Sequence, residues 1–124
     1  MCMRMRLLLI LLLVSGLLLF FHWAGITYTL YWVFAWYDLL THFLGGVVLA
    51  LSLAVFGKYK GYEPPFSHLL IFAFGVGIIW ELFELWAGIP REAGFLLDTT
   101  IDLGMDMLGA VFAYFLTRNI QKTS

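Results

Sequence analysis

Seven side chains of this chain are of types that bind cations or move protons, and all seven stand within or beside apolar stretches. They form three sets in the stretches YDLLTHF, WELFELW and DTTIDLGMDM, namely Asp38 with His42, Glu81 with Glu84, and Asp98 with Asp102 and Asp106. Intervals of three or four residues place each set on one face of a helix. Many carboxylates with a single imidazole suit hard or borderline ions such as Mg²⁺, Mn²⁺, Ca²⁺ or Zn²⁺. The pattern predicts a cation site with a divalent metal ion as its cofactor, provided that helices bring the three sets together.

The composition indicates which elements must position these residues. Of the 124 residues, 63% are hydrophobic and 12% are charged, whereas a soluble domain averages roughly half apolar and a quarter charged. Mean hydropathy is +0.95. Since a spanning helix needs about 20 apolar residues, we predict four transmembrane helices at residues 7–24, 34–57, 66–88 and 98–117. Lipid offers no hydrogen-bond partner to backbone N–H and C=O groups, so the predicted fold class is all-α. We predict an integral membrane bundle that forms a single domain over residues 1–124.

Positive charges predict how the bundle is oriented. All but one of the basic residues that flank the predicted helices fall on the same side of a serpentine chain, namely Arg4, Arg6, Lys58, Lys60, Arg118 and Lys122. Arg91 alone falls on the other side. Because Lys and Arg stay preferentially in cytoplasmic loops, we predict a multi-pass protein of the cell membrane with both termini cytoplasmic. The first apolar segment is longer than the core of a signal peptide and has no A-x-A-like cleavage site, so we expect a retained helix. The other side carries the aromatic residues expected of an interfacial belt: Trp23, Tyr28, Tyr31, Trp32, Trp36, Tyr37 and Trp86.

This topology places all three polar sets in the extracytoplasmic half of the bundle. At about 1.5 Å of rise per residue, Asp106 lies about 12 Å below Asp98, and Glu81 lies about 10 Å below the outer end of its helix. The three sets therefore overlap in depth. Each carboxylate inside a membrane costs roughly 2.5 to 3.5 kcal/mol, less near the interface. Bound cations or shared protons must offset that cost, and either remedy makes the cluster a site.

Several of these residues also suit structural roles. Asp98 and Asp38 stand where the N-caps of the fourth and second helices are expected, and the deeper acids suit interhelical hydrogen bonds or a water-filled vestibule. Small residues at four-residue spacing favour close helix packing: Gly46 with Ala50, Ala73 with Gly77, and Gly109 with Ala113. The sequence has no HExxH motif, no nucleophilic serine or cysteine near the acids, no dinucleotide fingerprint and no basic nucleic-acid-binding face. We therefore expect membrane lipid, and no nucleic acid, as a partner.

The ordered set of motifs resembles the YjdF-type family of small multi-spanning membrane proteins and, more distantly, the VanZ-like group. The shared frame comprises Tyr37-Asp38, His42-Phe43 and Gly46, then Glu81-x-x-Glu84 with Trp86, then Asp98, Asp102 and Asp106 with Gly109. It covers roughly residues 37–113, and this chain has fewer helices before the motifs than that family's pattern. The resemblance implies an integral membrane protein and assigns no biochemical role.

The same acids support three functional hypotheses. The first is a metal-dependent hydrolase or transferase that acts on a lipid-linked substrate at the outer leaflet, where the ion polarises a phosphoryl or acyl oxygen and activates water. Its expected metal ligands are Asp38, His42, Glu84, Asp98, Asp102 and Asp106, with Glu81 as general base and Arg91 as a clamp for an anionic substrate group. The second is a proton or cation carrier, which predicts a homo-oligomer because four helices are few for alternating access. The third is a non-enzymatic membrane partner protein whose acids bind an ion structurally.

Overall fold

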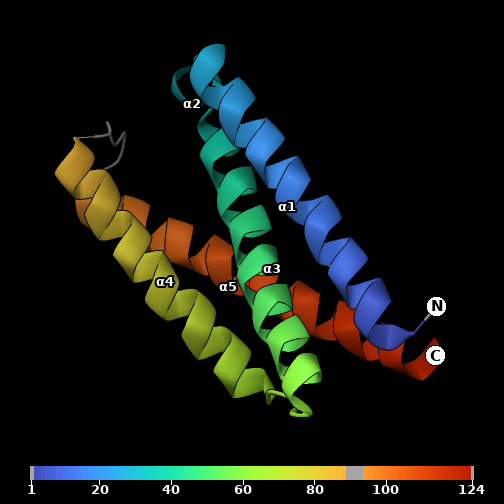
Figure 1. Ribbon diagram of the computed structural model, residues 1–124. Coiled ribbons are helices and arrows are strands. Elements are labelled where there is room, and N and C mark those ends of the chain that lie inside the picture. Colours follow the sequence, from blue (N-terminus) through green and yellow to red (C-terminus); the bar gives the residue numbers. More distant parts are fainter. Residues whose placement is uncertain (1, 89–93, 124) are drawn as a thin grey trace.

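A computed structural model describes residues 2–88 and 94–123, and every regular element in these ranges is a helix (Figure 1). The elements are α1 (Met3–Thr27), α2 (Leu30–Val33), α3 (Ala35–Lys60), α4 (Phe66–Ala87) and α5 (Phe95–Thr123). The four long helices have the length and apolar composition needed to cross a membrane. The predicted all-α class and the multi-pass membrane location are therefore confirmed. Only α2 was not predicted as a helix, because it is too short to give a periodic signal.

The helix ends follow from local residues. Gly61 adopts a left-handed φ of 74°, and the N–H of Tyr62 donates to the carbonyl of Gly57 at 2.7 Å, which ends α3. The long α5 begins at Phe95, and the N–H of Asp98 already donates to the carbonyl of Gly94 at 3.2 Å. Asp98 therefore lies in the first turn and is not the N-cap.

The capping role considered for Asp38 is also wrong, because the N-cap of α3 is Phe34 and Asp38 lies in the first turn. Both helices begin before their first aspartate because the aromatic and aliphatic residues that precede it are equally compatible with a membrane helix. Both aspartates still benefit from the positive end of their helix dipole.

The helix α3 is the centre of the bundle and contacts α1, α4 and α5. In Figure 1, α5 passes behind α3 at a steep angle while α1 and α4 lie to either side of α3. At the α3/α5 crossing, a Cβ atom on Gly46 would meet the backbone of Asp106, and one on Gly109 would meet the backbone of Phe43. Their paired alanines, Ala50 and Ala113, are almost fully buried. The prediction that these small residues allow close packing is confirmed.

One apolar core lies beneath the polar residues, on the side toward the end of α3. It consists of small and branched side chains from three helices: Val47, Ala50, Leu51, Leu69, Ala73, Ala110 and Ala113. By contrast, α1 contacts mainly α3. It exposes large side chains such as Leu13 and Leu19, which are 73% and 69% exposed. In a membrane these apolar faces contact lipid instead of water, so their exposure is not unfavourable.

Basic residues of α1, α3 and α5 lie near one end of the bundle. The first residues of α1 approach the end of α3, where the Arg4 guanidinium lies 5.7 Å from the centre of the Tyr59 ring. Figure 1 shows both ends of the chain at this same end of the molecule. The shared side agrees with the serpentine expected from the sequence, and its assignment to the cytoplasm stays a prediction.

Cysteine labelling checks that assignment. Cys2, the single cysteine in the sequence, is exposed at the basic end. We expect a membrane-impermeant maleimide to label Cys2 only after cells are permeabilised. In a Cys2→Ser background, Trp86→Cys provides the matched position at the opposite end, because Trp86 is 83% exposed near the end of α4. It should be labelled in intact cells, and the reverse pattern would invert the predicted orientation.

Candidate metal centre

Three helices bring all seven predicted residues together near the end of the bundle that carries α2. The chemistry-bearing side chains come from α3, α4 and α5: Asp38 and His42, Glu81 and Glu84, and Asp98, Asp102 and Asp106. We call this set the His–carboxylate cluster. The cluster is partly exposed at Asp38 and Asp98, whereas its other members are buried.

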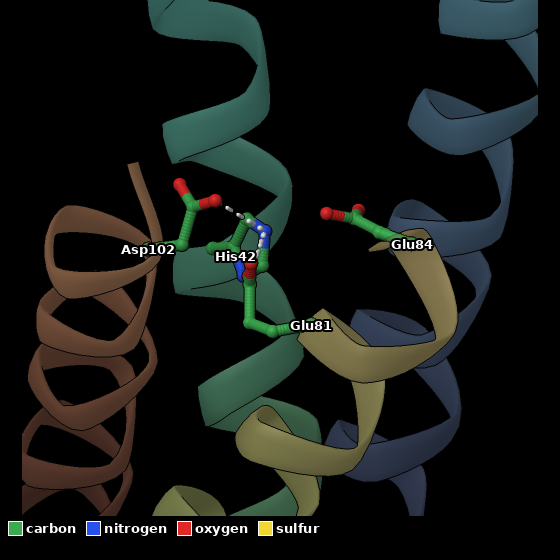
Figure 2. Close-up of side chains that lie close together, drawn as sticks. All are labelled: His42, Glu81, Glu84 and Asp102. Carbon is green, nitrogen blue, oxygen red and sulfur yellow. Dashed lines mark ion pairs between the residues drawn. The ribbon is translucent and has the colours of Figure 1, made fainter. Parts of the chain in front are cut away.

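The imidazole of His42 is the centre of the cluster. Its Nδ1 atom lies 3.0 Å from Oδ1 of Asp106, a normal hydrogen-bond distance. Its Nε2 atom lies 3.5 Å from Oδ2 of Asp102 and 3.6 Å from Oε1 of Glu81, the two contacts drawn in Figure 2. Oδ1 of Asp38 is also 3.6 Å from Nε2. One nitrogen therefore makes a hydrogen bond, while the other faces three carboxylate oxygens that are all too distant for one.

The two glutamates of α4 are oriented by hydrogen bonds from neighbouring side chains. The Thr99 hydroxyl donates to Oε2 of Glu81 at 3.2 Å, and the Trp80 indole N–H donates to Oε1 of Glu84 at 2.8 Å. Figure 2 shows both glutamates extending from α4 toward His42, with Asp102 approaching from α5 on the other side. Bonds of this kind, made by the atoms around a ligand set, are characteristic of protein metal sites.

Asp102 differs from the two glutamates because no neighbouring side chain among the described residues donates a hydrogen bond to it. It is 0% exposed, and neither carboxylate oxygen has a hydrogen-bond partner among the described residues. A hydrogen bond with the nearby Asp38 would require one of the two carboxyls to keep a proton, because an ionised carboxylate only accepts. A buried carboxylate without a partner is costly. Asp102 therefore needs a cation or a proton.

The distances between donor atoms define two groups that fit a metal ion. His42, Glu81, Glu84 and Asp102 each offer one ligand atom, and these atoms lie within 4.8 Å of one another. The same limit holds for a second group, which consists of Asp38, Asp98 and Asp102. The donor set contains one imidazole nitrogen and carboxylate oxygens, which suits Zn²⁺, Mn²⁺ or Mg²⁺ better than copper(I) or an iron–sulfur cluster.

Comparison with known proteins supports the membrane assignment. A family model described as "Predicted membrane protein (DUF2238)" matches residues 1–123. The chain belongs to this family. No curated protein and no solved structure matches the chain. The DUF2238 description names neither the YjdF-type family, which stays a prediction, nor the VanZ-like group, which has no support from these comparisons.

The structure of this DUF2238 chain refines the predicted roles of two residues and does not describe a third. Glu81, expected as a general base, lies in the same buried group as His42 and Asp102. Asp106, expected as a ligand, contacts the far nitrogen of the imidazole. Arg91, expected as an anion clamp, lies outside the described residues. The remaining candidates have ligand atoms in one or both of the groups above.

Sequence reasoning did not assign site roles to Trp80 and Thr99. Both stand at helical spacing from a cluster residue, since Trp80 precedes Glu84 by four residues and Thr99 precedes Asp102 by three. The same periodicity that grouped the acids could have grouped these donors with them. Threonine and tryptophan are common in membrane helices, so their hydroxyl and indole groups do not by themselves indicate a site.

Two tyrosines of this DUF2238 chain also depart from the expected aromatic belt. Tyr37 is only 3% exposed, and its hydroxyl donates to the carbonyl of Phe21 at 2.5 Å, so its assignment to the belt was wrong. Tyr31, on α2, is partly buried and forms a hydrogen bond of 2.9 Å with Nδ1 of His22. Burial raises the pKa of Tyr31 to about 12, and the nearby carboxylate of Asp38 adds to the effect.

The raised pKa of Tyr31 can be measured by spectrophotometric titration. Because burial disfavours the phenolate, the absorbance difference between wild type and Tyr31→Phe should show no transition near the ordinary value of about 10 and should develop toward pH 12. Below that range Tyr31 remains a neutral hydroxyl donor. Trp32→Phe on the same short helix controls for disturbance of α2. A difference transition centred near 10 would show that Tyr31 is accessible to water.

Proposed function

We propose that this protein binds a divalent metal ion through His42, Glu81, Glu84 and Asp102. The observation that carries the proposal is the position of Nε2 of His42, at 3.5 to 3.6 Å from oxygens of Asp102 and Glu81. In a tetrahedral site with metal–ligand bonds of about 2.1 Å, neighbouring ligand atoms are about 3.4 Å apart. This spacing supports a shared ion between these side chains. Asp106 is in the position of the outer carboxylate that orients a metal-binding histidine.

A protonated His42 that only forms ion pairs explains these distances less well. An imidazolium Nε2–H beside carboxylates normally forms a hydrogen bond of about 2.7 to 2.9 Å. Here all three oxygens near Nε2 are at 3.5 Å or more. One imidazolium would also carry a single positive charge against many carboxyl groups in a membrane. A divalent ion neutralises more of that charge and occupies the space that the ligand atoms surround.

The position of the cluster supports a metal-dependent hydrolase or transferase that acts on a lipid-linked substrate. Asp38, at the rim, has a side chain that is 31% exposed, whereas Asp102 is 0% exposed. A head group at the membrane interface can therefore approach from the α2 end, which we predict to be extracytoplasmic. A bound ion would supply Lewis-acid chemistry, polarising a phosphoryl or acyl oxygen and activating water. In this proposal Glu81 joins the ligand set. The YjdF-type resemblance assigns no reaction and is compatible with this one.

The carrier hypothesis receives less support. A carrier needs polar groups on both sides of its site, but the core cluster directly beneath the site is apolar and includes Val47, Leu51 and Ala110. These side chains separate the cluster from the basic end of the bundle. Transport through this bundle would therefore require the tightly packed core to open. A site that exchanges its substrate at one membrane surface does not require this core to open.

Metal analysis of the purified protein tests the binding proposal. Wild type incubated with Zn²⁺ or Mn²⁺ and then desalted should retain at least one equivalent of metal. Asp102→Asn and Glu84→Gln should lose it, because each removes a charged ligand. Glu63→Gln is the matched control, since Glu63 is exposed and bonds to Gln121 away from the cluster. A folded wild type that retains neither metal would contradict the proposal, as would full retention in both ligand variants.

Activity can then be tested separately. Wild type in mixed micelles should release inorganic phosphate from lipid phosphate esters, or fatty acid from lipid acyl esters, only when loaded with metal. A chelator and the Asp102→Asn variant should each abolish release, whereas Glu63→Gln should not. Metal binding without turnover of either ester class would remove the hydrolase proposal and leave the metal site in place.

A further inference from the structure

We infer that the cluster holds a pair of metal ions bridged by Asp102, with the second ion bound by Asp38 and Asp98 at the rim. This inference rests on the proposed metal site and extends it from one ion to two. It starts from the observation that Asp102 belongs to both groups of potential metal ligands. Ligand atoms of Asp38, Asp98 and Asp102 lie within 4.8 Å of one another, and Asp102 also belongs to the group around His42.

The state of Asp102 is the independent observation that favours a bridge. Its neighbours His42, Glu81 and Glu84 each make a hydrogen bond that occupies one side-chain atom. Asp102 makes none with the described residues through either oxygen, although it is fully buried. A ligand that binds one ion through a single oxygen would leave the other oxygen buried without a partner, whereas a carboxylate that bridges two ions through both oxygens satisfies each of them.

The positions of the two groups along the helices are consistent with this arrangement. Asp98 and Asp102 are one turn apart on α5, so both carboxyls extend from the same face of that helix. Asp38 is one turn from His42 on α3. The backbone positions of Asp38 and Asp98 are therefore about one turn, roughly 5.4 Å of helix rise, nearer the start of their helices than those of His42 and Asp102. Oδ1 of Asp38 nevertheless lies 3.6 Å from Nε2 of His42, so the two groups adjoin each other at Asp38 and Asp102.

Charge balance leads to the same conclusion. The cluster contains six carboxyl groups and one imidazole. With one divalent ion bound by His42, Glu81, Glu84 and Asp102, oxygens of Asp38 and Asp98 would still lie within 4.8 Å of an oxygen of its ligand Asp102. Like charges at such distances repel strongly where water is scarce. A second cation between Asp38, Asp98 and Asp102 converts the repulsion into attraction. Paired ions that share a carboxylate are well suited to activating water and holding a leaving oxygen.

Manganese binding provides the test, with Mn²⁺ as the probe. Wild type should bind two Mn²⁺ per chain, and electron paramagnetic resonance should show a spin-coupled pair in place of the hyperfine pattern of an isolated ion. Asp98→Asn and Asp38→Asn should each reduce the stoichiometry from two ions to one and restore the isolated-ion signal. Glu63→Gln, remote from the cluster, should behave as wild type. Circular dichroism of each variant reports whether the helices remain folded.

The outcomes separate this inference from the proposal on which it rests. One Mn²⁺ in wild type, as expected if Asp38 and Asp102 share a proton in place of an ion, overturns the pair and leaves the single site standing. No Mn²⁺ in wild type overturns both. A coupled pair that persists in both Asp98→Asn and Asp38→Asn overturns the assignment of these two residues. Loss of both ions from folded Asp98→Asn and Asp38→Asn overturns the second site as a separate one.

Discussion

Replacing His42 with glutamine should weaken divalent metal binding by more than about 100-fold, whereas replacing Asp106 with asparagine should weaken it by about 10- to 100-fold. The difference arises because Nε2 of His42 faces the carboxylate oxygens, while Asp106 contacts only Nδ1 on the far side of the ring. An asparagine can still accept the Nδ1–H hydrogen bond through its amide oxygen, but it loses the negative charge. Loss of such outer partners typically costs 10- to 100-fold in metal affinity.

Isothermal titration with Zn²⁺ on the purified variants measures both effects. His68→Gln is the matched control for His42→Gln, because His68 is exposed at the start of α4 and bonds to Tyr62. It should bind Zn²⁺ as wild type does. If Asp106→Asn lost binding as completely as His42→Gln, Asp106 would be a direct ligand, as the spacing alone suggested. Equal and unchanged affinity in both variants would exclude His42 from the site.

Gly46→Ala is expected to lower the free energy of unfolding by about 1 to 3 kcal/mol, the usual cost of overpacking a close contact. A Cβ atom there would meet the backbone of Asp106, which cannot rotate away as a flexible side chain can. The variant must therefore push α5 away from α3. Because Asp106 follows that movement, its hydrogen bond to His42 should also weaken, and metal affinity should fall together with stability.

Gly45→Ala is the matched control for Gly46→Ala. The two glycines are adjacent in α3, but a Cβ atom on Gly45 would meet nothing within 4 Å. Since alanine favours a helix over glycine by about 1 kcal/mol, Gly45→Ala should be neutral or stabilising. Thermal unfolding in detergent, followed by tryptophan fluorescence, compares the two. Equal melting temperatures for Gly45→Ala and Gly46→Ala would mean that α3 and α5 are not in close contact at Gly46.

The fold class followed from composition with little ambiguity, because lipid admits so few backbone arrangements. Long apolar stretches predicted the four spanning helices, and the small residue Gly46 marked one of the closest helix contacts. The helix ends were less accessible to prediction. Phe95, Leu96 and Leu97, which precede Asp98, are all acceptable in a membrane helix, so the sequence contained no local signal for where α5 begins before the first acid.

The candidate site was predictable as a set of residues but not as a set of roles. Spacing alone placed Glu81 and Glu84 on one face of their helix and Asp38 on the same face as His42. Spacing does not say which atom of a side chain faces which neighbour. The contact of Asp106 with Nδ1 and the absence of any hydrogen bond to Asp102 among the described residues depend on how α5 crosses α3.

The sequence by itself therefore determined that this chain is an α-helical membrane protein with acids collected toward one end of its helices. These properties depend on hydropathy and on helical periodicity, both of which are local. Only the tertiary structure decided that Tyr37 is buried, that Thr99 donates to Glu81, and that Asp102 belongs to two ligand groups. Those facts depend on the crossing of helices distant in sequence, where a rotation of one helix exchanges one neighbour for another.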